Sequence, residues 1–371
     1  MSDGASNACD VLIIGAGMAG AGLAAALPPE LRVILIEAEA TPGYHATGRS
    51  AAFWHETLGG PHVRTLTRAS YTALDEGGFL TPRRSLEVAE AEHLAKLDAL
   101  VDEFTGTGVR LDRLDRAGIL ALVPRAAPVL VGGLVEVDGA DIDVAGVHAA
   151  ALGKARRNGA TLITNARIDR IARTDGFWHV AAGGHNYTAE VIVDAAGAWA
   201  DSLARMADVA PLDIVPKRRT MVQVRINGDD VPADLPLVMD IAGRYYFRPV
   251  DAQRLWLCPH DETPVEPHDV APEEIDVATA IYQFERVTDW RVAAVERKWA
   301  GLRSFAPDRL PVIGFDVEAP GFFWLAGQGG VGIQTAPAVS RLAAALITRA
   351  DPDLPGVDPG RYDPKRFARL S

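Results

Sequence analysis

The stretch VLIIGAGMAG, residues 11–20, decides the fold of this chain. It begins with four consecutive apolar residues, Val11 to Ile14, which are typical of a strand buried on both faces. Gly15 permits a tight turn, Gly17 lets the backbone approach a pyrophosphate closely because it has no Cβ, and Gly20 lets the following helix pack on the strand. This order of residues predicts a site for the phosphates of a nucleotide.

A helix and a second strand complete the nucleotide-binding pattern. The helix is expected from Met18 to Leu27, with its free N–H groups and positive dipole end facing the phosphates. The second strand runs from Val33 to Ile36 and ends at Glu37, whose carboxylate would accept hydrogen bonds from a ribose 2′-hydroxyl and repel a 2′-phosphate. The whole pattern predicts a dinucleotide site and disfavours NADP, and the alternative is an ordinary βαβ turn.

Length, composition and charge favour a globular protein that binds a small molecule. The chain has 371 residues, of which 48% are hydrophobic and 23% charged, and a formal net charge of −12. That charge argues against a nucleic-acid partner, which needs clustered positive charge. Two cysteines, Cys9 and Cys258, are too few for a disulfide framework or a four-cysteine metal site, so we expect a cytoplasmic protein. No apolar run reaches the length that a membrane span needs.

Alternating strand-like and helix-like segments predict two domains, one of them discontinuous. A helix is expected to begin after the N-cap Asp143 and to stop at Gly159. It leads to three β-rich segments, which are residues 161–164, 177–181 and 187–194. Residues 82–88 and 213–298 carry alternating strand patterns and predict a second domain built on a sheet.

A second glycine-rich turn lies near the C-terminus. The strand-like residues 322–326 run into Gly327–Gly332, and a long helix follows up to Ile347. Five positions of this turn are Gly or Gln, so its backbone N–H groups are expected to be open to a ligand at a helix N-terminus. Such a site would stabilise negative charge on the pyrimidine side of a reduced flavin, whereas a nicotinamide would have no use for it. The alternative is a loop whose glycines serve packing alone.

Five further motifs follow the N-terminal one in a characteristic order. They are PGYHATGRSAA (residues 42–52), AAGAW (195–199), PKRR (216–219), AGLRSF (300–305) and QGGVGIQ (328–334). Together they resemble the FAD-dependent D-amino acid oxidase superfamily, and within it most closely the bacterial D-arginine dehydrogenases. The resemblance covers nearly the whole chain and implies a flavin in place of a nicotinamide.

The resemblance implies an α/β fold with two domains. One is a Rossmann-like FAD-binding domain in the ββα arrangement of glutathione reductase, formed by residues 1–80, 141–212 and 299–371. The other is a substrate-binding domain on an antiparallel or mixed β-sheet, formed by residues 81–140 and 213–298. Covalent flavin attachment in the family uses a cysteine near the 301–305 segment or a histidine near Ala52. Because the resemblance places neither residue at its matching position in this sequence, FAD is expected to be bound non-covalently.

The family's cofactor contacts carry over to residues spread along the chain. They would hold the ADP part of FAD, wrap the pyrophosphate, touch adenine through main chain and line the flavin ring. The residues are Gly15, Gly17, Met18, Ala19, Gly20, Glu37, Ala38, Thr47, Gly48, Arg49, Ser50, Ala51, Ala52, Ile168, Ala196, Gly197, Trp199, Gly301, Gly329, Gly330, Val331, Gly332, Ile333 and Gln334. Gly330 and Gln334 would also contact the substrate.

Three residues, Arg219, Tyr246 and Arg303, match the family's clamp for a substrate carboxylate. A guanidinium presents a planar fork to a carboxylate and a tyrosine hydroxyl adds one bond, which fixes the α-carbon over the flavin. With the amine neutral, the Cα hydrogen would pass as hydride to flavin N5, and water would hydrolyse the imino acid to a 2-oxo acid and ammonia. Each residue, taken alone, is also compatible with a structural role.

The resemblance implies that the substrate is an amino acid. Departures from the D-arginine dehydrogenase pattern indicate which kind of side chain that amino acid carries. Ser85 stands where those enzymes have a glutamate for the substrate guanidinium, and Leu237 and Met239 would add apolar wall. We therefore predict a D-amino acid with a neutral or apolar side chain. Arg84 and Arg244 leave an anionic side chain open.

Several assignments stay open at this level. His55 is either a proton acceptor for the substrate amine or, as we favour, a buried and hydrogen-bonded histidine. Cys258, His260 and Asp261 lack a second pair of ligands at metal-binding spacing, so no metal site is predicted. The alternative substrates are an N-methyl amino acid, glycine or a 2-hydroxy acid, and a non-catalytic flavoprotein is a further alternative. The electron acceptor is oxygen, a quinone or another carrier.

Overall fold

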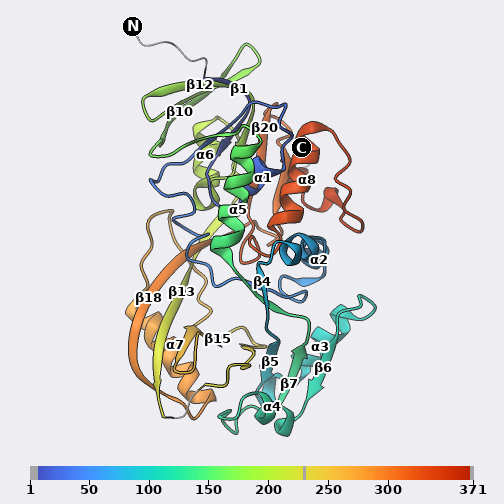
Figure 1. Ribbon diagram of the computed structural model, residues 1–371, viewed down its shortest axis with the longest axis vertical. Helices are drawn as coiled ribbons and strands as arrows, with labels where there is room; N and C mark the ends of the chain where they lie inside the picture. The colour runs from blue at the N-terminus through green and yellow to red at the C-terminus, as the bar shows by residue number, and fades with distance from the viewer. Residues whose placement is uncertain (1–6, 229–230, 368–371) are drawn as a thin grey trace.

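The upper part of the computed structural model, which describes residues 7–228 and 231–367, holds an eight-stranded sheet (Figure 1). Its strands are β1 (Ala8–Ile14), β2 (Val33–Ile36), β9 (Thr161–Ile163), β10 (Ile168–Thr174), β11 (Phe177–Ala182), β12 (His185–Asp194), β19 (Val312–Phe315) and β20 (Phe322–Ala326). Strands β9, β2, β1, β12 and β20 lie side by side and parallel, and β19 pairs antiparallel with β20. Strands β10 and β11 form an antiparallel meander with β12.

Helices cover one face of this sheet and the meander covers the other. Helices α1 (Met18–Ala26), α2 (Gly60–Glu76), α5 (Val144–Arg157) and α8 (Ala336–Thr348) share a core with Val11 and Ile13 of β1. The alternate residues of β1, Leu12 and Ile14, pack with the meander and with α6 (Ala200–Met206). The strand is therefore buried on both faces, as its run of apolar residues predicts. The result is three layers, which is the ββα arrangement expected.

The first turn packs as tightly as its glycines suggest. A Cβ on Gly20 would lie 1.9 Å from the carbonyl oxygen of Gly15, so α1 sits directly on the end of β1. Gly15 itself has φ +106°, a conformation that L side chains rarely adopt. The helix ends at Ala26, one residue earlier than expected, because Leu27 precedes Pro28 and takes an extended conformation.

The helix expected after Asp143 is confirmed as α5. Asp143 is its N-cap, and one carboxylate oxygen accepts from the N–H of Gly146 at 2.9 Å. Gly159, just beyond the C-cap residue Asn158, has φ +90° and ends the helix. The chain then enters β9, which adds to the edge of the parallel sheet beside β2.

The lower part of Figure 1 holds a nine-stranded mixed sheet. Its strands are β5 (Ser85–Ala89), β6 (Leu111–Leu114), β7 (Gly132–Glu136), β13 (Val215–Asn227), β14 (Leu237–Asp240), β15 (Tyr246–Pro249), β16 (Arg254–Cys258), β17 (Thr263–Pro264) and β18 (Arg291–Phe305). The order is β17-β13-β16-β15-β14-β5-β7-β6, with β18 paired to β13. Only β14 and β5 run parallel to each other in this path.

Alternation along β13 and β15 gives this second sheet two different faces. Val222 and Phe247 pack against helix α7 (Glu274–Val287) in one core. Their neighbours Met221 and Tyr246 belong to a separate cluster on the opposite face. Helices α3 (Leu94–Phe104) and α4 (Arg116–Leu122) cover the β6–β7 end. The face that carries Met221 and Tyr246 is therefore free to line a site.

The strand pattern at residues 82–88 divides between two sheets. Strand β4 (Leu80–Pro82) joins β8 (Ala140–Ile142) and β3 (Phe53–Trp54) in a three-stranded sheet, and β5 begins only at Ser85. Pro82 has no N–H to donate and ends the first ladder.

Short 3₁₀ helices lie at 91–93, 197–199, 359–361 and 364–367. Our division into two domains stays a prediction, and β18 runs through its boundary between residues 298 and 299.

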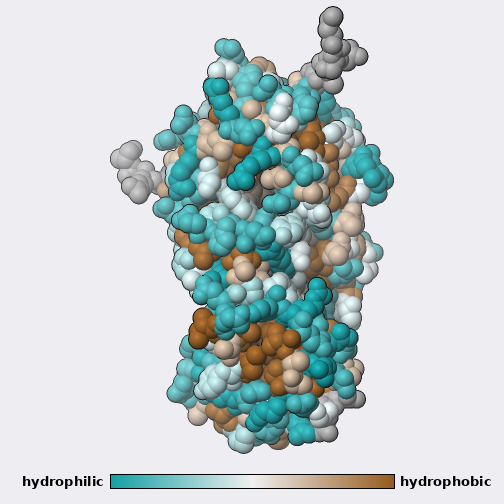
Figure 2. Space-filling view, turned by 90° about the vertical axis from the view of Figure 1, so that its left-hand side faces the viewer, coloured by the Kyte–Doolittle hydropathy of each residue, from teal (hydrophilic) through white to brown (hydrophobic). Residues whose placement is uncertain are grey.

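The side of the molecule with α7 and β18 carries a hydrophobic patch in its lower half (Figure 2). Among the large apolar side chains exposed on these two elements are Ile275 and Val295. No helix in the ranges 7–228 and 231–367 is long and apolar enough to cross a membrane.

Replacing Gly20 by Ala is expected to destabilise the protein and to weaken its retention of cofactor. The added methyl group would meet backbone, which cannot move aside as a side chain can, and overpacking of this kind costs about 1–3 kcal/mol. Urea unfolding followed by tryptophan fluorescence measures the loss, and the flavin-to-protein absorbance ratio measures retention. Gly153→Ala in α5 is the matched control, because its new Cβ would meet only the end of the Arg157 side chain. Equal stability of the two variants would contradict the prediction.

Candidate functional site

A large cavity lies at the carboxyl ends of the parallel strands. Its volume is about 400 Å³, and its walls come from the ends of β1, β2, β12 and β20 and from β13 and β18. Ligands of open α/β sheets bind at this edge, where the strands end and helix N-termini begin. The cavity therefore lies where the first sheet meets the second.

Most residues that we expect to hold the cofactor line this cavity. They are Gly15, Gly17, Met18, Ala19, Glu37, Ala38, Thr47, Arg49, Ser50, Ala51, Ile168, Ala196, Gly197, Trp199, Gly301, Gly329, Gly330, Gly332 and Ile333. Five others do not line it, namely Gly20, Gly48, Ala52, Val331 and Gln334. Gly20 lies behind the cavity and packs on Gly15, which lines it. Gln334 is buried, and its side-chain amide donates to Thr67 Oγ1 at 2.9 Å.

Glu37 closes the nucleotide-binding turn. Its Oε2 accepts from the backbone N–H of Ala16 at 2.8 Å, and its Oε1 accepts from the N–H of Glu39 at 3.0 Å. A carboxylate has about four lone-pair positions, so both oxygens can accept a further hydrogen bond. This arrangement fits the hydroxyl groups of a ribose.

The N-terminus of α1 is open toward the cavity. Gly17 is the N-cap residue and brings no capping side chain. The N–H of Met18 donates to Thr47 Oγ1 at 2.9 Å, which holds the 42–52 loop against the helix. The N–H of Gly17 has no acceptor in the part of the chain that the structure describes. Free N–H groups at the positive end of a helix fit a pyrophosphate.

The glycine-rich turn after β20 supplies further unpaired N–H groups. Gly330, Gly332 and Ile333 line the cavity, and their N–H groups have no acceptor among the described residues. Donors in this position fit the negative charge that a flavin ring develops on reduction. Helix α8 begins only at Ala336, so these groups belong to a turn and not to the helix N-terminus that we expected. A further turn intervenes, and Pro337 suits the first turn of the helix because it lacks an N–H.

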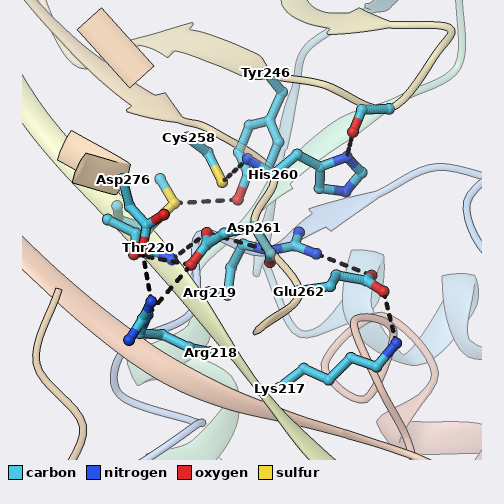
Figure 3. Close-up of polar contacts among 12 residues, drawn as sticks. Lys217, Arg218, Arg219, Thr220, Tyr246, Cys258, His260, Asp261, Glu262 and Asp276 are labelled. Atoms are coloured by element: carbon cyan, nitrogen blue, oxygen red, sulfur yellow. Dashed lines mark hydrogen bonds and ion pairs between the residues drawn. The ribbon is translucent and has the colours of Figure 1, made fainter. Parts of the chain in front are cut away.

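Arg219 on β13 is held by the polar loop after β16. Its Nε donates to the carbonyl oxygen of Asp261 at 2.7 Å, and its Nη2 donates to Glu262 Oε1 at 3.1 Å (Figure 3). Only 4% of the side chain is exposed, and Nη1 has no hydrogen-bond partner among the described residues. Arg219 lines the cavity, so its guanidinium adds positive charge to the cavity wall.

Glu262 is shared by three cations. Besides Arg219, its carboxylate pairs with Arg309 at 2.8 Å and with Lys217 at 3.1 Å. The hydrogen bond from Arg309, followed by that from Lys217, lowers the pKa of Glu262 to about 2. Glu262 and the carboxylate of Asp261, whose Oδ1 lies 4.0 Å from Arg219 Nε, therefore hold Arg219 in position without balancing all of the positive charge around it.

Arg303 on β18 carries a charge that has no counter-ion among the described residues. In the antiparallel pairing, Arg219 lies opposite Gly301 and Lys217 lies opposite Arg303. Arg303 lines the cavity and forms no ion pair with a carboxylate in the described ranges. Burial, and then the neighbouring charge of Arg219, lower the pKa of Arg303. A guanidinium in this situation is stabilised by a bound anion, and a carboxylate matches its planar fork.

Tyr246 on β15 lies beside the two arginines. Its hydroxyl donates to Met221 Sδ at 3.1 Å, and burial raises its pKa (Figure 3). Met221 lines the cavity, whereas Tyr246 does not. A thioether is a weak acceptor, so a carboxylate oxygen would be a better partner for this hydroxyl.

The residues that we expect to contact the substrate divide between the cavity and the wall behind it. Gly330 lines the cavity, whereas His55, Ser85, Leu237, Met239 and Gln334 do not. Ser85 and Leu237 are 2% and 0% exposed, because they lie opposite each other in the parallel pair β5 and β14. Leu237 and Met239 pack with Phe53 and Tyr246 in one apolar cluster, which is the wall.

His55 is buried, as we favour, but it is not hydrogen-bonded. It is 1% exposed, and neither ring nitrogen has a partner among the described residues. The ring lies against Gly139, where a Cβ would come within 2.1 Å of His55 Cε1. Burial lowers the pKa of His55 to about 3, so the ring is neutral at neutral pH.

Three side chains of this region were missed as site residues. Met221 lies two residues after Arg219, and Glu87 lies two residues after Ser85, so the period of two in a strand would have found both. Glu262 follows the end of β16 and reaches Arg219 from 43 residues away. No local pattern gives that contact.

Glu87 is a carboxyl group without a hydrogen-bond or ion-pair partner among the described residues. It lies on β5 opposite Met239 of β14. Burial, with smaller contributions from the charges of Asp240 and Glu136, raises its pKa to about 8. The group is therefore largely protonated at neutral pH.

Comparisons with known proteins bear on this arrangement. The family model described as "DAO: FAD dependent oxidoreductase" matches residues 10–346. Glycine oxidase from Geobacillus kaustophilus (strain HTA426) is 28% identical over 92% of this chain and 93% of the oxidase. Mitochondrial dimethylglycine dehydrogenase from Homo sapiens is 26% identical over 95% of this chain, which spans 44% of that relative. The crystal structure of L-proline dehydrogenase from P. horikoshii has a TM-score of 0.85 at 20% identity and 98% coverage of both chains.

Replacing Glu87 by Gln is expected to stabilise the protein at pH 8 and to change little at pH 5. The ordinary pKa of this group is 4.5 and its folded value is about 8, so the folded state binds more protons between these values. The wild type therefore loses stability as the pH rises through this interval, by about 1–3 kcal/mol, and the Gln variant does not. Urea unfolding at both pH values measures the difference. Glu318→Gln, at an exposed position, is the control, and a pH-independent difference for Glu87→Gln would count against the prediction.

Proposed function

This chain belongs to the DAO family of FAD-dependent oxidoreductases, and we propose that it oxidises an α-amino acid whose carboxylate is held by Arg303 and Arg219. Membership confirms the expected α/β fold, the oxidoreductase activity and the FAD cofactor. The observation that carries the proposal is Arg303, a half-buried cation that lines the cavity without a carboxylate partner among the described residues. The chain is similar to glycine oxidase and dimethylglycine dehydrogenase, whose names state that they act on amino acids.

The two arginines and the tyrosine would play different parts in holding the carboxylate. Arg219 is already fixed by Glu262 and Asp261 and offers its remaining Nη1. Arg303 offers its whole fork, and Tyr246 can exchange its thioether contact for a carboxylate oxygen. A planar anion held by several donors has one orientation, which fixes the position of its Cα.

Orientation is the main contribution that the chain itself would make to the reaction. Bound FAD supplies the acceptor for the hydride that leaves Cα, and the imino acid that results takes up water to give a 2-oxo acid and ammonia. Burial lowers the pKa of His55 to about 3 and that of His260 to about 4, so both rings are neutral at pH 7. The substrate would therefore lose its ammonium proton to solvent before it reacts.

We propose that FAD is held without a covalent bond. Neither Cys9 nor Cys258 lines the cavity, and both are free thiols buried in their own sheets. Two free thiols also suit the cytoplasmic location that we propose from the sequence. The electron acceptor remains oxygen, a quinone or another carrier in this proposal.

The first substrate candidate is a D-amino acid. It rests on the resemblance to bacterial D-arginine dehydrogenases, with Ser85 in place of the glutamate for a guanidinium. The apolar cluster of Phe53, Leu237 and Met239 fits a neutral or apolar stretch of side chain next to Cα. The second candidate is glycine or an N-methyl amino acid, which is favoured by the similarity to glycine oxidase and dimethylglycine dehydrogenase.

Anaerobic bleaching of the bound flavin by a panel of D- and L-amino acids tests the reaction. We expect bleaching by at least one α-amino or N-methyl amino acid, with ammonia or methylamine as the second product, and none by D-arginine at comparable concentration. Lactate and other 2-hydroxy acids serve as the comparison that separates the alternative chemistry. A flavin that no amino acid reduces would leave the chain as a non-catalytic flavoprotein.

Arg303→Met is expected to lower kcat/KM for the best amino acid by about a hundredfold or more, because truncating one partner of a buried charge pair costs about 2–5 kcal/mol. Arg303→Lys keeps the charge but not the planar fork and should recover part of the loss. Arg297→Met, on the same strand at an exposed position, is the matched control and should behave as the wild type. Equal KM values in the Arg303→Met and Arg297→Met proteins would remove Arg303 from the clamp.

A further inference from the structure

A third arginine, Arg248, stands on the same face of the second sheet as Tyr246. The two residues are separated by one position on β15, and Phe247 between them points to the opposite core. The Arg248 guanidinium lies 4.5 Å from the ring centre of Trp256 and 5.7 Å from that of Phe53. Phe53 packs edge-on against Tyr246, with ring centres 6.1 Å apart. Arg248 does not itself line the cavity; it stands at the far end of the apolar wall, on the side away from the clamp.

The charge around Arg248 is not balanced. Its Nη1 lies 2.8 Å from Asp141 Oδ1, while Arg83 Nε lies 2.6 Å from the other oxygen of the same carboxylate. Two guanidinium groups therefore share one acid. The Nε of Arg248 is buried and has no acceptor among the described residues. Buried donors of this kind are costly to leave unpaired, and an anion would satisfy this one.

Neighbouring groups do not cancel this positive charge. Glu87, on the same face of the sheet, has its pKa raised to about 8 by burial and is largely protonated at neutral pH. Arg84 and Arg244, the two arginines that the sequence offered for an anionic side chain, are paired with other carboxylates. Arg244 donates to Asp240 at 2.7 Å and also to Glu90, and Arg84 lies on the surface 3.8 Å from Asp234.

We propose that Arg248 binds a second carboxylate of the substrate, so that the preferred substrate is an amino dicarboxylic acid. The α-carboxylate would lie on Arg303 and Arg219, and the second carboxylate would lie on the Nε side of Arg248. Tyr246, which lies beside the clamp, and Arg248 are two residues apart on β15, which is about 7 Å along the strand. This separation suits a spacer of one to three atoms between the reacting carbon and the second carboxylate. The inference rests on the proposed function, and it replaces the neutral side chain expected from the sequence by one with a charged end.

The test compares acids with their neutral counterparts in the FAD-loaded enzyme. The pairs are D-aspartate with D-asparagine, D-glutamate with D-glutamine, and iminodiacetate with sarcosine. We expect at least one acid to exceed its neutral partner in kcat/KM for anaerobic flavin bleaching by about tenfold or more. In Arg248→Met this ratio should fall to about one, because the acids lose the partner of their second carboxylate. Arg84→Met is the control and should keep the wild-type ratio.

The outcomes separate this inference from the proposed function. Wild-type ratios near one, or a ratio that survives in Arg248→Met, would overturn the role of Arg248 while amino acid oxidation stood. Should Arg248→Met fail to fold or to bind FAD, the wild-type ratio and Arg248→Lys decide, because lysine keeps the charge without the fork and should lower the ratio several-fold. If glycine, D-alanine and all six test compounds leave the flavin oxidised, it is the proposed function that fails.

Discussion

The antiparallel pairing of β13 with β18 is the constraint on which the site depends. It runs along all 13 residues of β13. It also reaches the glycine-rich turn, because the N–H of Gly329 donates to the carbonyl oxygen of Ser304 at 2.8 Å. Like charges repel, so Arg219 and Arg303 would move apart if they stood on independent segments. The ladder keeps them beside one another and against the cavity, and the fold thereby maintains an attraction for anions.

The same arrangement of charge occurs at two places on one face of the sheet. At the clamp, Glu262 is shared by Arg219 and two other cations, and Arg303 has no acid among the described residues. At the far end of the wall, Asp141 is shared by Arg83 and Arg248. In both places cations outnumber the carboxylates that position them, and the surplus charge is left for a ligand.

The fold could be predicted where the signal is local. The apolar run Val11–Ile14, the cap at Asp143 and the stop at Gly159 each depend on neighbouring residues, and the structure has strand β1 and helix α5 there. The site depends on contacts between distant segments, such as Glu262 with Arg219 and Arg248 with Asp141. Resemblance to a family could name the arginines, but their partners follow only from the register of the sheet. For the same reason Ser85 and Leu237, carried over as substrate contacts, lie in the wall.

Glu262 has a consequence for how the site responds to acid. Its pKa of about 2 lies below any pH at which a protein of this kind is assayed, and arginine does not deprotonate in proteins. Glu262 and the arginines of the clamp therefore keep their charges across the whole working range. The ammonium group of the incoming amino acid, by contrast, must lose its proton before hydride transfer, so turnover is expected to rise with pH as that group titrates.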